Sequence, residues 1–211
     1  MKKFLLVLCA MLMVFGMVGI ASAVPINSNS DVALTGATII DFESVAQGTY
    51  TSITVNDVTF SAGNNHLMID DDWQIYNMTG VYLDNGTYAN HGFQSLTVDF
   101  ATDVNAFGFN WGMAEAWATW TLSAYDATDS IIDSRGLPNG SFSGEFYGLA
   151  TAGISYAVIQ QTSGDYDWIG IDNFTYVSSG APVPEPSTIL LMGVGLLGLV
   201  GYSRKRLIKK S

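Results

Sequence analysis

Short runs of alternating apolar and polar residues, separated by turn-forming residues, constrain the fold of this chain most. In residues 95–100, Leu96, Val98 and Phe100 alternate with polar residues, as in a half-buried antiparallel strand. No window between the two ends of the chain shows a sustained helical period. The expected strands are 37–42, 58–61, 73–77, 80–83, 95–100, 105–111, 118–126, 130–133, 142–148, 154–160 and 169–177. The pattern predicts an all-β fold, a two-sheet antiparallel sandwich of the jelly-roll type.

Charged residues are segregated along the chain. Residues 24–182 carry 18 acidic side chains and one basic side chain, Arg135, and the other Lys and Arg residues lie at the two ends. A nucleic-acid binder needs a basic surface to displace counterions from phosphates, so nucleic acid is excluded as a partner. The acidic surface either keeps copies of the domain apart in solution or gathers carboxylates around a hard cation such as calcium.

Residues 1–23 have the three parts of a secretory signal peptide. Lys2 and Lys3 precede a long apolar run, and Ala21-Ser22-Ala23 supplies the small residues at which signal peptidase cuts. An uncleaved membrane anchor is the alternative, and the Ala-x-Ala sequence favours cleavage. The single cysteine, Cys9, lies inside this run, so the mature domain has neither a disulfide nor a thiolate site.

The C-terminal end has three ordered parts. Pro184, Glu185 and Pro186 form an extended segment that a protease can grip. An apolar run over 188–202 is expected to form a transmembrane helix, and its 15 residues fall below the roughly 17–25 of a stable span, which suits a transient anchor. The basic residues that follow favour the cytoplasmic side, which leaves the domain facing outward. They are Arg204, Lys205 and Arg206, followed by the basic end 208–211.

This combination resembles the PEP-CTERM protein-sorting domain, a tail that is also labelled an ice-binding-protein C-terminal domain. The resemblance covers residues 183–207, after a linker at 178–182. It implies export through the inner membrane and recognition by an exosortase, a membrane protease and transpeptidase. It also implies a Gram-negative host that makes exopolysaccharide, as in a biofilm. The chain would be membrane-anchored before processing and would reach the cell surface or the extracellular matrix after it.

The domain between the two ends, residues 24–177, also resembles the jelly-roll domains of exported bacterial proteins, some of which are carbohydrate-binding modules. The similar residues are Ile40-Asp41-Phe42-Glu43, Val104-Asn105-Ala106-Phe107-Gly108-Phe109 and Ile171-Asp172-Asn173-Phe174. Those modules often carry a structural calcium near the first and last strands. The resemblance therefore implies calcium at Glu43 and Asp172, with Asp41 as a third ligand, whereas capping and turn roles are the alternative.

Tryptophans beside carboxylates are the main sign of a ligand. A tryptophan ring stacks on the apolar face of a sugar, and a nearby carboxylate accepts hydrogen bonds from its hydroxyls. Trp120 shares the apolar face of its strand with Leu122 and is expected in the core, whereas Trp117 falls on the polar face. The candidate ligand-binding residues are Trp117, Glu115, Trp73 and Trp168; packing in the core is the alternative for each tryptophan.

Catalysis has little support in the sequence. His66 and His91 are the only histidines, and neither lies in a recognised catalytic motif. With one arginine and no lysine, residues 24–182 offer few groups that could stabilise developing negative charge. We expect a non-catalytic domain that binds extracellular polysaccharide. The alternatives are a polysaccharide hydrolase or lyase and a purely structural matrix protein.

Overall fold

The computed structural model describes residues 24–63, 66–72, 78–86, 93–112, 114–140 and 145–180. The chain divides into two compact units, residues 1–179 and 180–211, and the fold below is that of the first. The expected strand at 73–77, the signal peptide and the sorting tail lie outside the described residues. Within the part that is described, no helix has the length and hydropathy needed to cross a bilayer.

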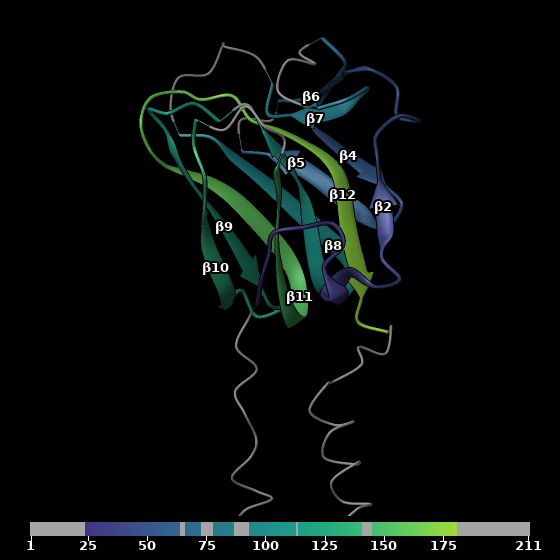
Figure 1. Cartoon of the computed structure of the whole chain (residues 1–211). Helices are drawn as coiled ribbons and strands as arrows, with labels where there is room; N and C mark the ends of the chain where they lie inside the picture. The colour runs from purple at the N-terminus through teal and green to yellow at the C-terminus, as the bar shows by residue number, and fades with distance from the viewer. Residues whose placement is uncertain are drawn as a thin grey trace, which may run out of the picture. The chain divides into compact units, whose positions relative to one another are not determined.

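The described part of the first unit is built almost entirely from β-strands (Figure 1), which confirms the all-β prediction. The strands are β1 (Val24–Ile26), β2 (Thr38–Ile40), β3 (Gly48–Tyr50), β4 (Ser52–Val55), β5 (Val58–Ala62), β6 (Leu67–Asp70), β7 (Tyr82–Asp84), β8 (Ser95–Gly112), β9 (Thr119–Tyr125), β10 (Ile131–Leu137), β11 (Glu145–Ser163) and β12 (Gly170–Ser178), with the 3-10 helix η1 (Val32–Leu34) after β1. All their pairings are antiparallel.

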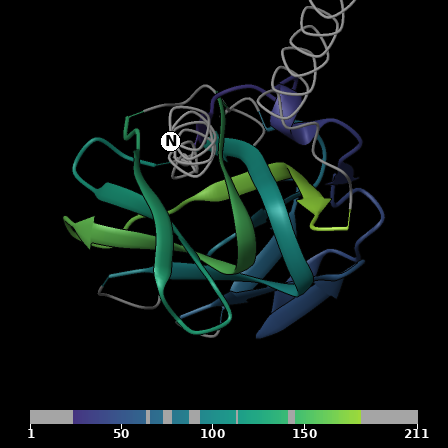
Figure 2. The ribbon, with the colours of Figure 1, turned by 90° about the horizontal axis from the view of Figure 1, so that it is seen from below.

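Two long strands, β8 and β11, run through both layers of the sandwich. The first half of β8 pairs with β5 and with the second half of β11, which also pairs with β9. The second half of β8 pairs with β12 and with the first half of β11, which also pairs with β1. The β8–β11 register shifts between Ala150 and Tyr156, where the strands turn from one layer into the other (Figures 1 and 2).

These long strands correct the sequence-based prediction of separate strands. Residues 95–100 and 105–111 belong to one strand, as do 145–148 and 154–160, the described parts of the two strands expected at 142–148 and 154–160. The alternation is interrupted in β8 because residues 101–103 are all exposed, although the backbone there stays extended and paired. A break in the burial pattern therefore marks a corner of the sandwich rather than a turn.

The core between the layers is dominated by stacked aromatic rings. Phe174 of β12 stacks on Phe109 with ring centroids 6.2 Å apart, and on Phe107 at 6.0 Å. From the opposite layer, Phe60 meets Phe174 edge to face at 5.2 Å. Fully burying a side chain of this size stabilises the fold by about 1.5–3 kcal/mol, so this cluster holds the layers together without a disulfide.

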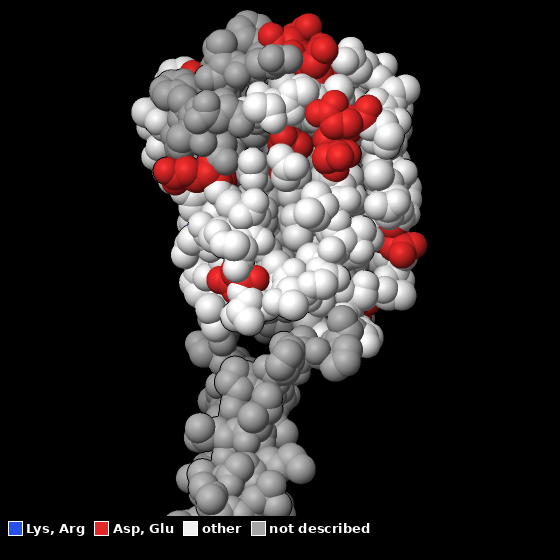
Figure 3. Space-filling model, turned by 45° about the vertical axis from the view of Figure 1, so that its right-hand side comes forward, with Lys and Arg blue, Asp and Glu red and all other residues white. Residues whose placement is uncertain are grey.

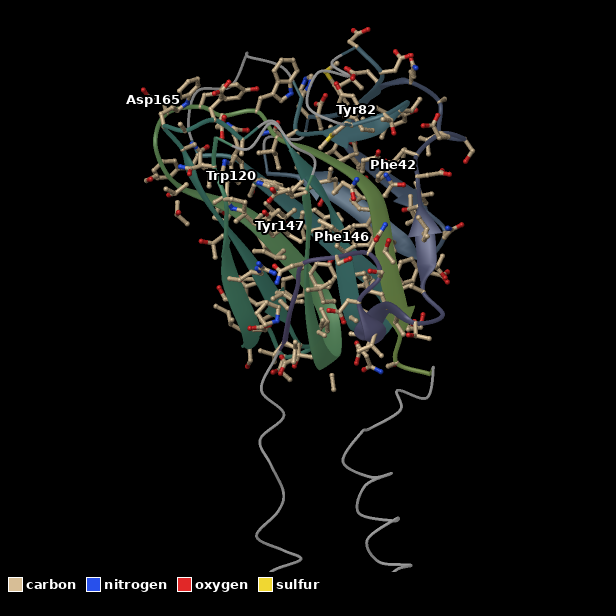
Figure 4. All side chains as sticks on the ribbon, viewed as in Figure 1. Phe42, Tyr82, Trp120, Phe146, Tyr147 and Asp165 are labelled. Carbon is tan, nitrogen blue, oxygen red and sulfur yellow. The ribbon has the colours of Figure 1, made fainter. Side chains whose placement is uncertain are left out.

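Glycines let β8 and β11 approach closely at the centre of the sheet. Gly108 and Gly148 are cross-strand partners. A Cβ on Gly148 would overlap the carbonyl oxygen of Phe107, and a Cβ on Gly108 would overlap the ring of Phe146. Phe146 lies in the middle of the domain, beside Tyr147 (Figure 4). The alternation of small and large residues in Ala106-Phe107-Gly108-Phe109 thus serves packing on both faces of β8.

Gly148→Ala should destabilise the domain by about 2–4 kcal/mol, because the new methyl group meets backbone rather than a side chain that can move. Urea unfolding of the full chain measures this difference. Gly136→Ala on β10 is the matched control, since nothing lies within 4 Å of its Cβ position. Equal midpoints for the two variants would refute the close-approach explanation.

Candidate functional site

Trp117 lies exposed on a tight turn that follows β8. The turn closes through a hydrogen bond from Ala118 N to Glu115 O at 3.2 Å. Trp117 keeps 59% of its surface exposed, whereas Trp120 at the start of β9 keeps 2%. The strand alternation predicted this difference, and Trp120 indeed belongs to the core.

Buried Asp167 holds this turn in place through hydrogen bonds. Its carboxylate accepts a hydrogen bond from Trp120 Nε1 at 2.6 Å, and the Glu115 backbone N–H lies 3.3 Å from each of its oxygens. Asp167 is buried, and burial raises its pKa, although the Trp120 and Glu115 hydrogen bonds oppose the rise. Its neutral donors make Asp167 a structural support for the turn.

A second support comes from the segment after β10. Asn139 Nδ2 donates to Ala118 O at 2.7 Å and to Ala116 O at 3.2 Å, and so spans the turn. Gly140 N donates to Ala114 O at 2.9 Å. Gly164, at a φ of +91°, packs so closely that a Cβ would lie 2.9 Å from the Ala118 Cα. Segments far apart in sequence therefore fix the backbone that carries Trp117.

The other predicted ligand-binding residues are distributed around this turn. Glu115 is half-buried on the same turn as Trp117. Trp168 follows Asp167 but is half-buried, packs on Met78 and Tyr82, and lies near enough to Asp84 to lower the pKa of that carboxyl. Trp73 lies outside the described residues. Figure 4 places Trp120 and Asp165 towards the same end of the domain as Tyr82.

Sequence reasoning missed Asp167 and Asn139 as parts of this site. No motif singles out Asp167, and its partners Glu115 and Trp120 lie 52 and 47 residues away. The sequence signal that could have identified Asp167 was an acidic residue directly before a tryptophan, just ahead of strand β12.

The three predicted calcium ligands lie close together, where β2 ends and β12 begins. Asp172 is buried, and its pKa rises to about 6, chiefly because of burial and further because of the negative charges of Glu43 and Asp41. However, both Asp172 oxygens accept hydrogen bonds from Asn173, at 2.6 and 3.0 Å, and Glu43 Oε1 accepts one from Val81 N at 3.0 Å.

Among the described residues, no group of three or more acidic, histidine or cysteine side chains is arranged to hold a metal ion. Calcium at Glu43, Asp172 and Asp41 stays a prediction.

A second pair of buried carboxylates lies on the β6–β7 ribbon. Burial raises the pKa of Asp84 to about 7, the Gly86 backbone N–H partly opposes this, and the charge of Asp70 adds to it. On the face shown in Figure 3, most acidic side chains lie in the upper half of the domain and no basic side chain is visible. Within the described residues, the candidate site is thus an anionic end of a β-sandwich that carries a fixed, exposed tryptophan, Trp117.

Comparison with known proteins identifies the tail first. A family model described as the PEP-CTERM protein-sorting motif matches residues 182–206, which include the predicted Pro184, Glu185, Pro186, Arg204, Lys205 and Arg206. The chain therefore carries a PEP-CTERM sorting motif. It is an exported protein, anchored in the membrane before an exosortase processes its C-terminal tail and directed to the cell surface afterwards.

Solved structures similar to this chain include an adhesin domain and two carbohydrate-binding modules. The K2 cleaved adhesin domain of Lys-gingipain is 10% identical with a TM-score of 0.44, covering 68% of this chain and 98% of its own. The family 32 carbohydrate-binding module from C. perfringens NanJ, solved with galactose, is 11% identical with a TM-score of 0.39, covering 60% and 97%. TmCBM61, solved with β-1,4-galactotriose, is 13% identical with a TM-score of 0.33, covering 57% and 88%. No curated protein matched the sequence.

The raised pKa values of Asp84 and Asp172 predict that, in EDTA, the domain loses stability as the pH rises from 5 to 8. A folded-state pKa above the unfolded value gives stability that is complete below the unfolded pKa and disappears as the pH passes the folded one. For Asp84 the rise from 3.8 to about 7 is about 3 units, equivalent to about 4 kcal/mol.

Thermal unfolding of the full chain across this pH range measures the effect, and Asp84→Asn should flatten the curve. A melting temperature that increases with pH would show that these carboxylates are charged and compensated in the folded state.

Proposed function

We propose that the exported domain is a non-catalytic carbohydrate-binding domain that presents Trp117 as a stacking surface for a sugar ring. The observation that carries the proposal is an exposed indole on a turn fixed by buried Asp167 and by Asn139. Exposing a large aromatic side chain to water gains nothing for folding, whereas a fixed backbone lowers the entropy lost when a ligand binds.

Glu115 supplies the polar part of the proposed site. It lies two residues before Trp117 on the same turn, and its backbone is held by Asp167. A carboxylate beside an indole can accept hydrogen bonds from adjacent sugar hydroxyls while the ring face packs on the indole. Trp168 contributes indirectly, by packing next to the segment that anchors the turn.

The charge of the domain indicates the class of sugar. With 18 acidic residues and one basic residue over 24–182, the surface repels anionic chains rich in uronic acid or sulfate. The one basic group, Arg135, is already engaged by Ile26 O, Gly148 O and Asn27 Oδ1, at 2.8, 3.1 and 2.8 Å. We therefore expect a neutral glycan of the extracellular matrix.

The same scarcity of cations argues for binding rather than catalysis. Arg135 also lies over the Tyr147 ring, 5.2 Å from its centroid, so it is not free to stabilise an anionic transition state. A hydrolase or lyase remains an outcome of the test, read as turnover of the bound polysaccharide.

Trp117→Ala should weaken binding of the full chain to its neutral glycan at least tenfold, without a change in melting temperature, because the removed side chain is mostly exposed. A glycan array followed by calorimetry on the best ligand measures the loss. Phe93→Ala is the matched control, since Phe93 is an exposed aromatic residue with 63% of its surface accessible.

Retained binding in Trp117→Ala, or equal losses in both variants, would remove Trp117 from the site. Silence of the wild-type chain on every glycan would overturn the proposal and favour a purely structural matrix protein.

Asn139→Ala should weaken the same glycan binding while Trp117 itself is intact. The variant frees the carbonyls of Ala116 and Ala118 and loosens the turn. We expect a loss smaller than that of Trp117→Ala, with a more unfavourable binding entropy in calorimetry. An unchanged affinity and entropy would contradict the preorganisation argument.

A further inference from the structure

The β6–β7 ribbon has one apolar face and one acidic face. Its register pairs Met68 with Asp84 and Asp70 with Tyr82. Leu67, Ile69 and Leu83 point into the main core. Cross-strand partners share a face, so Met68, Asp70, Tyr82 and Asp84 all lie on the other side, where Asp70 and Asp84 are diagonal neighbours.

Both carboxylates of this acidic face are almost fully buried. Asp70 exposes 8% of its surface and Asp84 only 1%. Asp84 Oδ1 accepts a hydrogen bond from Gly86 N at 2.6 Å. Asp84 Oδ2 and Asp70 Oδ1 are buried without any hydrogen-bond partner in the structure. A buried carboxylate oxygen without a partner is unfavourable, because it has lost its bound water and gained no hydrogen bond in exchange.

Residues 24–182 contain one basic side chain, Arg135, which is bound elsewhere by β1 and β11. The titratable neighbours are His66 two residues before Met68, Tyr82 on β7, and the exposed Asp71 and Asp72, which add negative charge after β6. The Trp168 indole, which lowers the pKa of Asp84, is neutral.

We propose that Asp70 Oδ1 and Asp84 Oδ2 are ligands of a divalent cation of the calcium type. Diagonal residues on paired strands lie roughly 7–8 Å apart, and two such carboxylates can each place an oxygen at about 2.4 Å from a common point. Oxygen-only donors on an exported protein suit a hard cation, with water filling the remaining positions. This site is distinct from the group formed by Glu43, Asp172 and Asp41, which lies at the β2–β12 pair.

The position of the pair couples the ion to the Trp117 turn. Asn85, next to Asp84, donates from Nδ2 to Asp167 O at 3.1 Å and accepts from Ile169 N at 3.1 Å. Tyr166 Oη donates to Gly86 O at 2.8 Å. An ion that orders the end of β7 therefore also orders residues 166–169, whose Asp167 holds the turn. This consequence rests on the proposed glycan site, whereas the cation site itself does not.

Terbium luminescence tests the site directly, because Trp168 contacts Asp84 and can sensitise a lanthanide bound there. In a test buffer at pH 7.5, we expect the full chain to give terbium emission when its indoles are excited. Excess calcium should abolish this emission by displacing the terbium ion. Two carboxylates predict weak affinity, a Kd of about 10⁻⁴–10⁻³ M for calcium by calorimetry, as in extracellular modules. Asp84→Asn and Asp70→Asn should each weaken calcium binding at least tenfold.

Three variants separate this site from others. Trp168→Phe should lose the emission and keep calorimetric binding, because Trp168 is the sensitiser and not a ligand. Asp57→Asn, an exposed acid on the β4–β5 turn, and Asp172→Asn, in the other carboxylate group, should both keep the emission. Emission that survives Asp84→Asn and Asp70→Asn but disappears in Asp172→Asn would move the ion to that other group.

Two further outcomes would overturn the proposal. The first is a wild-type chain with neither terbium emission nor calcium heat. The second is calcium binding that both Asp84→Asn and Asp70→Asn retain. Circular dichroism establishes that each variant is folded, and Asp84→Asn is expected to be more stable than wild type in EDTA at pH 8. A wild-type chain that binds terbium but no glycan would reject the proposed glycan site and leave the cation site in place.

Discussion

The structure depends on satisfying buried carboxylates in a domain that has almost no cations. Asp167 solves the problem with neutral donors, the indole of Trp120 and the backbone of Glu115, and in doing so it ties two loops together. Asp84 receives a single strong backbone bond and keeps one oxygen without a partner, as does Asp70. The oxygens of Asp167 all have hydrogen-bond donors. The Asp70–Asp84 pair has two buried oxygens without a donor, and the proposed metal ion would occupy the space between them.

The core supplies the rigidity on which both arrangements rely. The stacked rings of Phe107, Phe109 and Phe174 fill the space between the layers, while Gly108 and Gly148 bring β8 and β11 into close backbone contact. Because β8 and β11 continue through the corner of the sandwich, the layers are one connected hydrogen-bonded system. A displacement at one sheet is thus transmitted along a strand, without the need for a cross-link.

The sequence predicted the class of fold and part of the site for clear physical reasons. Period-two alternation reports which face of a strand is buried, so Trp117 and Trp120 were separated correctly. The same period fails at a corner, where residues 101–103 are exposed on both faces, and this failure divided β8 into two expected strands. Four short strands, β1, β3, β4 and β6, were not predicted, because three or four residues carry little periodicity.

Long-range hydrogen bonds lie beyond any local pattern. Asp167, Asn139 and Asn85 act on residues between 21 and 84 positions away, and their neighbours in sequence do not identify those partners. The sorting tail is the opposite case. Its signal is local and ordered: Pro-Glu-Pro is followed by an apolar run and a basic cluster. The family match to residues 182–206 confirms the sorting motif, and no knowledge of the fold is needed to recognise it.

The strand directions set which part of the domain a tether can hide. Ser178, where the chain leaves β12, pairs with Val104, and Val24 at the start of β1 pairs with Ala150 near the same corner. From Val104, β8 runs eight residues to Gly112, roughly 25 Å, before the Trp117 turn begins. The end of β12 and the exposed indole thus lie towards different ends of the second half of β8, so contacts made at Ser178 leave the Trp117 turn uncovered.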